Sequence, residues 1–318
     1  MLSQVVELIE NKNTFAITTH VKPDGDGVGS SLGLCWLLRS LGKEVEVVVR
    51  GDVPPAYLSL PGAEDIRNVT SINGRYDAVF VIECSDLARP GIDGLDKQFT
   101  VNIDHHSTSE HFGTINWIDS TASAVGEMIY NLCKAIGGRI TKEIAECVYL
   151  ALVTDTGSFH FPNTSDRTLK VASELIRAGA KPAEIGQAVY NNYPWSRIEL
   201  MRQVLDTVKR DETGRVAMLR QTLAMRDRAG AIDGDNSGFV NIPLAAKEVL
   251  AVVYMREIGP DKYRASLRSK GNINVARVAE RFGGGGHKNA SGLSIDGDWD
   301  EKEREIVAAL AEAVAEAD

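Results

Sequence analysis

Cysteine, positive charge and long apolar runs are all in short supply in this chain, and each shortage excludes a class of protein. Only four of its 318 residues are cysteines. They are widely spaced in apolar or helical contexts, which favours buried free thiols over a disulfide framework or a zinc knuckle. No apolar stretch is long enough to span a bilayer, and no basic-then-apolar leader follows the first methionine. We therefore expect a cytoplasmic protein with no membrane partner.

The charge balance is acidic, with 44 aspartate and glutamate residues against 35 lysine and arginine residues and a net charge of −9. Long nucleic acids bind largely through neutralisation of their phosphates, so this excess argues against an extended groove for long duplexes or single strands. A small anionic substrate remains compatible with it, because a metal centre reverses the local field. With 318 residues and 43% apolar content, the chain is long enough for two domains with well-formed cores.

Strand and helix signals alternate through the first part of the chain. The predicted strands are 14–19, 44–50, 78–83 and 99–104. The predicted helices are 28–41, 122–136, one from 142 onward and a helical segment over 165–192, in which Pro182 starts a helix. This alternation is typical of an α/β fold with a doubly wound parallel sheet. We expect that domain over 1–192, a helical linker over 193–212 and a smaller α/β domain over 213–318.

Acidic and histidine residues gather in clusters that follow apolar runs in this first part. The clusters are THVKPDGDG (19–27), FVIECSD (80–86), NIDHH (102–106) and LVTDTGSF (152–159). Each run with its cluster is typical of the carboxyl end of a buried parallel strand, where ligands bind in open α/β sheets. The candidate ligands are His20, Asp24, Asp26, Glu83, His105 and Asp155. Imidazoles mixed with carboxylates suit Mn²⁺, Zn²⁺ or iron, and the set is too large for one ion, which indicates a two-metal hydrolytic site.

A second candidate site lies near the end of the chain, in GGGGHKNASG (283–292). A run of glycines is often a flexible linker, but this one follows a predicted amphipathic helix and leads into a predicted strand. Its N–H groups could therefore cradle a phosphate. The candidate contacts are Gly284, Gly285, Gly286, His287 and Asn289, with Ser291 beside them.

The strand YRASLRSKG (263–271) lies upstream of the glycines. Alternation places Arg264, Ser266, Arg268 and Lys270 on one face, suited to an anion. Solvated charges on an edge strand remain an alternative for Arg264 and Lys270. Arg268 is the residue that we expect to bind a substrate phosphate, with Ser266 beside it.

Taken together, these motifs resemble the DHH phosphoesterase superfamily. The spacing His20-x3-Asp24-x-Asp26, the DHH triplet and the downstream TDTG carry the resemblance, which spans roughly the whole chain. The glycine run resembles the nucleotide-binding loop of the C-terminal domain that accompanies the DHH domain. The chain is most similar to the nanoRNase and pAp-phosphatase branch, whose members hydrolyse very short oligonucleotides and 3′-phosphorylated adenosine nucleotides.

The resemblance implies a role for each residue of the first site. His20 and Asp24 would bind one metal ion, and a second set would bind the other, namely Asp26, His105 and Asp155. His106 would contact the scissile phosphate, while Asp104 would orient an imidazole from behind. The two ions would be Mn²⁺, with Mg²⁺ or Co²⁺ as alternatives, and would activate water for in-line attack on phosphorus.

The chain departs from the family pattern at Glu83, where the family usually presents an aspartate that bridges both ions. A glutamate keeps the carboxylate on a side chain one methylene longer, so bridging remains the expectation. Asp86 is the competing candidate, although its position three residues past the strand run favours a loop-capping role. His111 and His160 match no ligand position of the family.

Other functions share part of this pattern. A family II inorganic pyrophosphatase or exopolyphosphatase would share the acidic clusters, as would a RecJ-like exonuclease, but the glycine run and the chain length favour the nucleotide branch. A cyclic-dinucleotide phosphodiesterase stays open, and so does a non-catalytic nucleotide-sensing module, supported only by Glu83. The expected partners are short oligonucleotides or mononucleotide bisphosphates rather than long duplexes. Base preference, cleavage polarity and oligomeric state are left open, a homodimer included.

Overall fold

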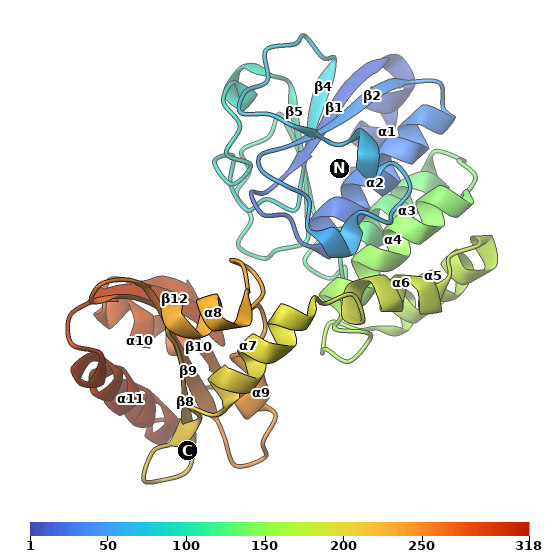
Figure 1. The fold of residues 1–318 in the computed structure, drawn as a ribbon. Helices are drawn as coiled ribbons and strands as arrows, with labels where there is room; N and C mark the ends of the chain where they lie inside the picture. Colours follow the sequence, from blue (N-terminus) through green and yellow to red (C-terminus); the bar gives the residue numbers. More distant parts are fainter. Residues whose placement is uncertain (318) are drawn as a thin grey trace. The chain divides into compact units, whose positions relative to one another are not determined.

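The computed structural model describes residues 1–317 and divides into two compact units, Met1–Asn192 and Tyr193–Asp318. Each unit has its own sheet (Figure 1). Each unit also has its own apolar core. No helix among the described residues is long and apolar enough to cross a membrane.

The first unit is built on a parallel sheet with six strands in the order β3-β2-β1-β4-β5-β6. The strands are β1 (Thr14–Thr19), β2 (Glu44–Val49), β3 (Arg67–Asn68), β4 (Ala78–Ile82), β5 (Thr100–Asp104) and β6 (Ile115–Ile118). This confirms the predicted parallel α/β sheet. Strand order reverses between β1 and β4, and in such sheets the carboxyl ends at the reversal form the ligand-binding crevice.

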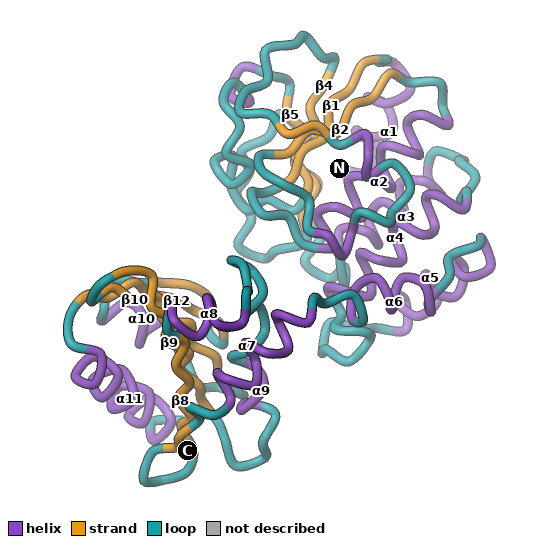
Figure 2. The backbone as a smooth tube through the Cα atoms, in the orientation of Figure 1, coloured by secondary structure: helices purple, strands orange, loops and turns teal. Residues whose placement is uncertain are grey.

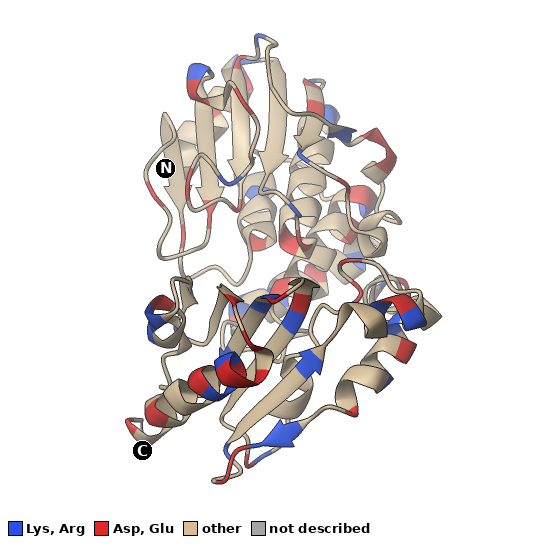
Figure 3. Ribbon diagram, turned by 60° about the vertical axis from the view of Figure 1, so that its left-hand side comes forward, with Lys and Arg blue, Asp and Glu red and all other residues tan. Residues whose placement is uncertain are grey.

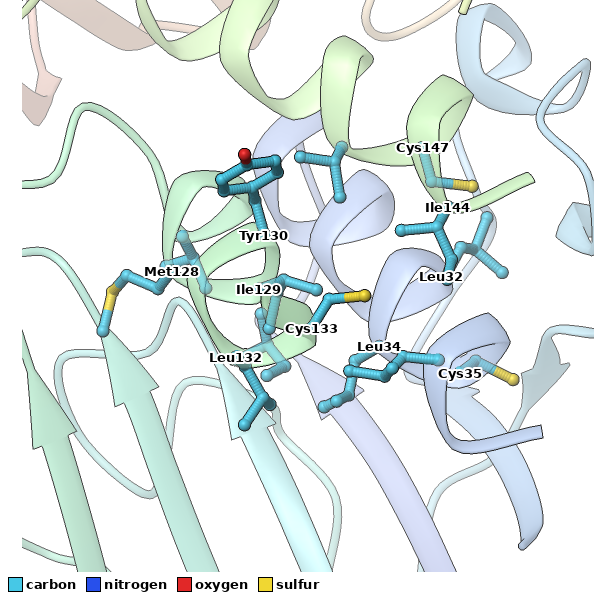
Figure 4. Packing of buried hydrophobic residues seen from close by; sticks show 14 of the residues in the cluster. Leu32, Leu34, Cys35, Met128, Ile129, Tyr130, Leu132, Cys133, Ile144 and Cys147 are labelled. Atoms are coloured by element: carbon cyan, nitrogen blue, oxygen red, sulfur yellow. The ribbon is translucent and has the colours of Figure 1, made fainter. Parts of the chain in front are cut away.

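Helices gather on one side of this sheet, as Figure 2 shows. They are α1 (Leu2–Asn11), α2 (Gly25–Ser40), α3 (Val125–Ala135), α4 (Lys142–Asp155), α5 (Asp166–Ala178) and α6 (Pro182–Tyr190). Aliphatic side chains of α2, α3 and α4 interdigitate in the core, with the sulfurs of Cys35, Cys133 and Cys147 among them (Figure 4). All four cysteines are buried and free, as predicted.

The opposite face of the sheet is covered by irregular segments instead of helices. Ile72, Ile92 and Leu95, from the connections on either side of β4, pack against Ala16 and Val79 of the strands. The connection after β4 includes a single turn of 3-10 helix, Leu95–Lys97, and no α-helix is described in either connection.

One local prediction for this unit was wrong. The cluster LVTDTGSF does not follow a strand; Asp155 is the last residue of helix α4, in agreement with the helix predicted from 142 onward. Residues 147–153 of that helix are buried without interruption, and a helix buried on several sides has the same continuous apolar pattern as a buried strand.

The predicted helical segment 165–192 consists of two helices, α5 and α6. Gly179 ends the first with φ +117°, and the second starts at Pro182, as predicted.

The second unit has a mixed six-stranded sheet in the order β11-β12-β10-β9-β8-β7. Its strands are β7 (Lys209–Arg210), β8 (Val216–Gln221), β9 (Ala251–Gly259), β10 (Lys262–Ser269), β11 (Gly285–His287) and β12 (Ala290–Asp296). Its helices are α7 (Trp195–Leu205), α8 (Leu223–Ala229), α9 (Asn241–Leu244), α10 (Val275–Arg281) and α11 (Trp299–Ala315). Only β8 and β9 pair in parallel.

The two faces of this second sheet are covered unequally. Helices α10 and α11 cover one face with apolar residues such as Val278 and Leu310. On the other face, α7 and α8 pack over β8 and β9, where Leu200 and Val204 of α7 join a cluster with Tyr254. The half formed by β10 and β12 has exposed residues on that face, namely Arg264, Gly292 and Ser294.

Candidate metal centre

The carboxyl ends of three adjacent strands bring the predicted ligands together. His20 follows β1, Glu83 follows β4, and His105 follows β5, and these strands are neighbours in the order β1-β4-β5. Helix α2 contributes Asp24 and Asp26 from its first turn, and α4 contributes Asp155 from its last residue. Every residue of the predicted ligand set therefore lies at one edge of the sheet.

Glu83 lies at the centre of this arrangement. Its Oε2 is 3.4 Å from Nε2 of His20, yet this oxygen is buried without a hydrogen-bond partner. The Glu83 backbone has a φ of +57°, uncommon for a residue with a side chain. Glu83 belongs to three groups of potential metal ligands, and within each group the ligand atoms all lie within 4.8 Å of one another. The first group adds His20 and Asp24, the second adds Asp26, His105 and Asp155, and the third adds His105 and His106.

Gly27 of α2 makes room for this carboxylate. A Cβ atom at this position would lie 2.6 Å from Oγ1 of Thr19 and 2.9 Å from Oε2 of Glu83. Side-chain atoms do not approach each other so closely, so any other residue would displace Glu83 or the end of β1. This contact between Gly27 and Glu83 emerged only from the structure.

Asp26 is fixed by the amino-terminal end of helix α3. The backbone N–H groups of Val125 and Gly126 donate to its two carboxylate oxygens at 2.7 and 3.0 Å, and the Ser30 hydroxyl donates at 2.6 Å. A helix amino terminus carries partial positive charge and stabilises a carboxylate there. These partners hold the buried Asp26 in one orientation, and its Oδ2 lies 3.9 Å from Nε2 of His105.

His105 presents one ring nitrogen to the carboxylates. Its Nδ1 lies 3.3 Å from the carbonyl oxygen of Ala122, which fixes the ring. Its Nε2 is 3.5 Å from Oδ2 of Asp155 and is buried without a hydrogen-bond partner. A buried polar atom that lacks a partner is costly, and a cation bound here would satisfy both His105 and Glu83.

His106 is held differently, by Asp104 behind it. Oδ1 of the buried Asp104 accepts from the backbone N–H groups of His105 and His106 and lies 2.8 Å from Nδ1 of the His106 ring. This hydrogen bond raises the pKa of His106 and, against the effect of burial, lowers the pKa of Asp104. The His106 side chain is 31% exposed, so its ring is accessible to a substrate.

The pKa shifts in the centre reflect crowded, buried charge. Burial raises the pKa of Glu83 well above its usual range, and burial with repulsion from Asp26 raises the pKa of Asp155 to about 7. Burial alone would favour a neutral His20, but the carboxylates of Asp24 and Glu83 beside its ring raise its pKa to about 10. The protein therefore takes up protons where its carboxylates converge, and divalent cations would replace them. The donor set and its unpartnered atoms fit such cations.

Asp86 and two histidines lie outside the centre. Asp86 accepts from the backbone N–H groups of Ala88 and Arg89, a loop-capping role, and belongs to none of the potential ligand groups. His111 and His160 are also absent from those groups, which were searched among the described residues. The sequence did not predict that Ser30 and the first N–H groups of α3 would donate to Asp26. The N–H groups reach Asp26 only because α2 packs against α3.

In the second unit, the glycine run forms a short hairpin. Gly285–His287 is strand β11, which pairs with β12. A Cβ atom on Gly286 would lie 2.6 Å from Cα of Ser291, and the φ of Gly286 is +143°, so this position requires glycine. Gly284 lies close to β12 in the same way, and His287 is exposed.

Two of the polar residues near this hairpin have structural contacts. The Asn289 amide nitrogen lies within 3.2 Å of three acceptors, Oγ of Ser269 and the carbonyl oxygens of Gly271 and Ile273. The Ser291 hydroxyl donates to the carbonyl of Val275. The amide nitrogen of Asn289 therefore holds the turn after β10, which leaves Oδ1 as its available polar atom.

The predicted face of β10 carries three of its expected four members. Arg264, Ser266 and Arg268 alternate with buried residues along the strand. Lys270 lies beyond its end, where Nζ donates to the carbonyl of Ala246. The Arg268 guanidinium donates to the carbonyl of Leu267, and burial lowers its pKa.

Comparisons with known proteins agree with this architecture. Residues 14–152 match the DHH family N-terminal domain, and residues 216–316 match the DHHA1 domain. The chain is 32% identical to the bifunctional oligoribonuclease and PAP phosphatase NrnA of Thermus thermophilus, over 100% of this chain and 94% of the relative. It is 31% identical to the Bacillus subtilis protein of the same name, over 96% of each.

A solved structure of an exopolyphosphatase-related protein from Bacteroides fragilis superimposes with a TM-score of 0.91 at 32% identity, covering 98% of this chain and 95% of that one. Each of the two domain matches lies within one of the two units. The chain therefore belongs to the DHH family of phosphoesterases, with a DHHA1 domain after its DHH domain.

Proposed function

We propose that this protein hydrolyses very short oligoribonucleotides and 3′-phosphoadenosine 5′-phosphate (pAp) with two divalent metal ions. The observation that carries the proposal is Glu83, whose unpartnered carboxylate oxygen lies in the middle of a full set of histidine and aspartate ligands. The names of the Thermus and Bacillus relatives, oligoribonuclease and PAP phosphatase, support this choice of substrates.

Each ion would be held by side chains already in place. His20 and Asp24 would bind one ion with Glu83 as the shared ligand. Asp26, His105 and Asp155 would bind the other ion, again with Glu83. Because the donors mix imidazole with carboxylate, Mn²⁺ suits this set better than Mg²⁺, which prefers oxygen ligands, and Co²⁺ is a further alternative.

Bound divalent ions would supply Lewis-acid activation of water and of the phosphoryl group. The chain itself would orient the phosphate. His106 carries a raised pKa and an accessible ring, so its protonated form would donate a hydrogen bond to a phosphate oxygen. Asp104 would keep the Nδ1 proton of His106 in place and stabilise the charge on the ring.

The second unit would hold the remainder of the substrate. Arg268 has no carboxylate partner among the described residues, and its guanidinium would bind a phosphate that does not react. Ser266, His287, Asn289 and the backbone around Gly284–Gly286 would add contacts beside it. Binding of this remote phosphate would help to position the reacting phosphate at the metal centre. Loss of the remote contact would therefore lower the rate of hydrolysis as well as the affinity.

A substrate panel with Mn²⁺ tests the proposal: pAp, pApA, pGpG, RNA of several dozen nucleotides, inorganic pyrophosphate and polyphosphate. We expect release of phosphate or mononucleotide from the short substrates and slow cleavage of long RNA. Inclusion of polyphosphate tests the function in the name of the Bacteroides relative. Turnover of pyrophosphate or polyphosphate alone would overturn the nucleotide assignment.

A variant separates the second unit from the metal centre. Arg268→Ala should raise KM for the short substrates. The increase should correspond to a loss of about 1.5–3 kcal/mol of binding free energy, the scale of a hydrogen bond to a charged group. Metal content should stay unchanged, because Arg268 is not a ligand. Unaltered kinetics would remove Arg268 from the site.

A further inference from the structure

Two arginines face each other on the half of the second sheet that carries exposed residues. Arg256 of β9 and Arg264 of β10 are direct cross-strand partners in the antiparallel register. Their side chains project from the same face of the sheet, because partners in register share a face. Like charges directly opposite each other destabilise a sheet, and an arginine cannot lose its proton to relieve this. The pair therefore costs stability in the free protein.

No acidic partner offsets this cost among the described residues. Arg264 is exposed and has no hydrogen bond or ion pair to another described side chain. Arg256 is fixed over the ring of Tyr254, with Nη1 3.3 Å from Oδ1 of Asn236. Its Nε is buried and lacks a hydrogen-bond acceptor. The buried Nε of Arg256 and the solvent-exposed guanidinium of Arg264 are therefore donors that a bound anion would satisfy together.

A hollow of about 360 Å³ lies beside this pair. Its lining includes Ser266 and Ser294 with their hydroxyls, and the side chain-free Gly283 and Gly284. None of its lining residues is acidic, and all belong to the described part of the chain. Figure 3 shows bands of basic residues on strands of this sheet. Arginine forks and hydroxyls are donors that bind phosphate oxygens, and the glycines let an anion approach closely.

We propose that this hollow, formed at Arg256 and Arg264, binds a second non-reacting phosphate of an oligonucleotide, distinct from the phosphate at Arg268. Arg264 and Arg268 are four positions apart on β10, which is about 13 Å along an extended strand. Arg268 does not line the hollow, and its guanidinium donates to the carbonyl of Leu267. The two positions therefore serve different phosphates.

The proposal rests on the proposed function, in which one phosphate reacts at the metal centre and Arg268 holds another. The bisphosphate pAp and the dinucleotide pApA each have only these two phosphates. A trinucleotide such as pApApA has a third, and the hollow at Arg256 and Arg264 gives that phosphate a place. This pair is thus a determinant of substrate length, favouring three phosphates over two.

The test compares Arg256→Gln/Arg264→Gln with Arg264→Gln alone and with a matched control, Arg277→Gln. Arg277 is an exposed arginine on α10, which covers the other face of the same sheet. We expect the double variant to lose about 10- to 100-fold in kcat/KM on pApApA, the scale of lost hydrogen bonds to a charged group. On pAp and pApA it should lose less than about two-fold, and Arg277→Gln should lose nothing on any substrate.

Binding without turnover gives an independent measurement. Fluorescence anisotropy of 3′-fluorescein-labelled pApApA in EDTA measures affinity in the absence of hydrolysis. The affinity for pApApA should be lower in the double variant than in the wild type. Arg264→Gln, which removes an exposed side chain without partners, covers the case in which the double variant does not fold. Equal losses on pAp and pApApA, or unchanged affinity for pApApA, would overturn the assignment. A wild-type protein that binds pApApA but hydrolyses none of the panel would instead refute the proposed function.

Discussion

Replacement of Glu83 by glutamine tests the metal centre most directly. If the carboxylate bridges both ions, the neutral amide of Glu83→Gln cannot balance two dications, although its shape is nearly unchanged. Glu83→Asp retains the charge on a shorter side chain and should have a milder effect. Asp86→Asn is the matched control, because Asp86 caps a nearby loop and belongs to no ligand group.

The size of the effect follows from burial. Glu83 is 4% exposed, and removal of one partner from a buried charged interaction costs about 3–5 kcal/mol. This corresponds to roughly 200- to 5,000-fold weaker Mn²⁺ binding. Activity at Mn²⁺ concentrations that saturate the wild type should fall accordingly. Isothermal titration calorimetry measures the binding, and hydrolysis of pApA measures the activity.

The metal-free protein should respond in a different way. Burial raises the pKa of Glu83, so without metal this side chain tends toward the neutral acid, which glutamine resembles. The metal-free Tm of Glu83→Gln should therefore stay within about 2 °C of the wild-type value, the shift expected for less than 1 kcal/mol. The increase in Tm on adding Mn²⁺ should largely disappear. If Asp86→Asn lost Mn²⁺ binding while Glu83→Gln retained it, the bridging role would belong to Asp86.

The remaining predictions concern the same centre. Chelation should abolish hydrolysis, and Asp155→Asn should lower Mn²⁺ content measured by inductively coupled plasma mass spectrometry; full activity in EDTA would contradict this. The pKa values of Asp155 (about 7) and His20 (about 10) are raised by folding, so both groups bind more protons when folded and their contribution to stability is lost as pH rises. The Tm of the metal-free protein should therefore fall between pH 5 and 8, and saturating Mn²⁺ should flatten this dependence in a thermal-melt series. Gly27→Ala should impair Mn²⁺ binding, because its Cβ would lie 2.9 Å from Glu83; an alanine variant with normal affinity would show that the end of β1 adjusts freely.

Much of the fold was predictable because apolar runs in this chain have the length and spacing of buried strands. The strands β1, β2, β4 and β5 begin and end within one residue of their predicted bounds. Strands β3 and β6 were missed. The first has only two residues, both exposed, and the second has four, of which one is buried. Such edge strands bury too little to leave a periodic pattern in the sequence.

The site was predictable to a different degree. The ligand residues were identifiable because acidic and histidine residues at strand ends converge whenever the strands are neighbours. Gly27, Ser30 and the N–H groups of Val125 and Gly126 were not identifiable, since their contacts depend on how α2 packs against α3 and β4. The Arg256–Arg264 pair was missed for a similar reason. Its significance lies in the register between two strands rather than in either strand alone.

The hydrogen bonds that fix Asp26 bear on when the centre forms during synthesis. Asp26 and the N–H group of Val125 are separated by 99 positions in the sequence, yet they are 2.7 Å apart in the folded chain. A nascent chain that has exposed His20, Glu83 and the DHH triplet to solvent still lacks the helix that orients Asp26. It also lacks Asp155, the last residue of α4. High-affinity metal uptake therefore has to wait until α3 and α4 have emerged from the ribosome, and shorter nascent chains would hold metal only loosely.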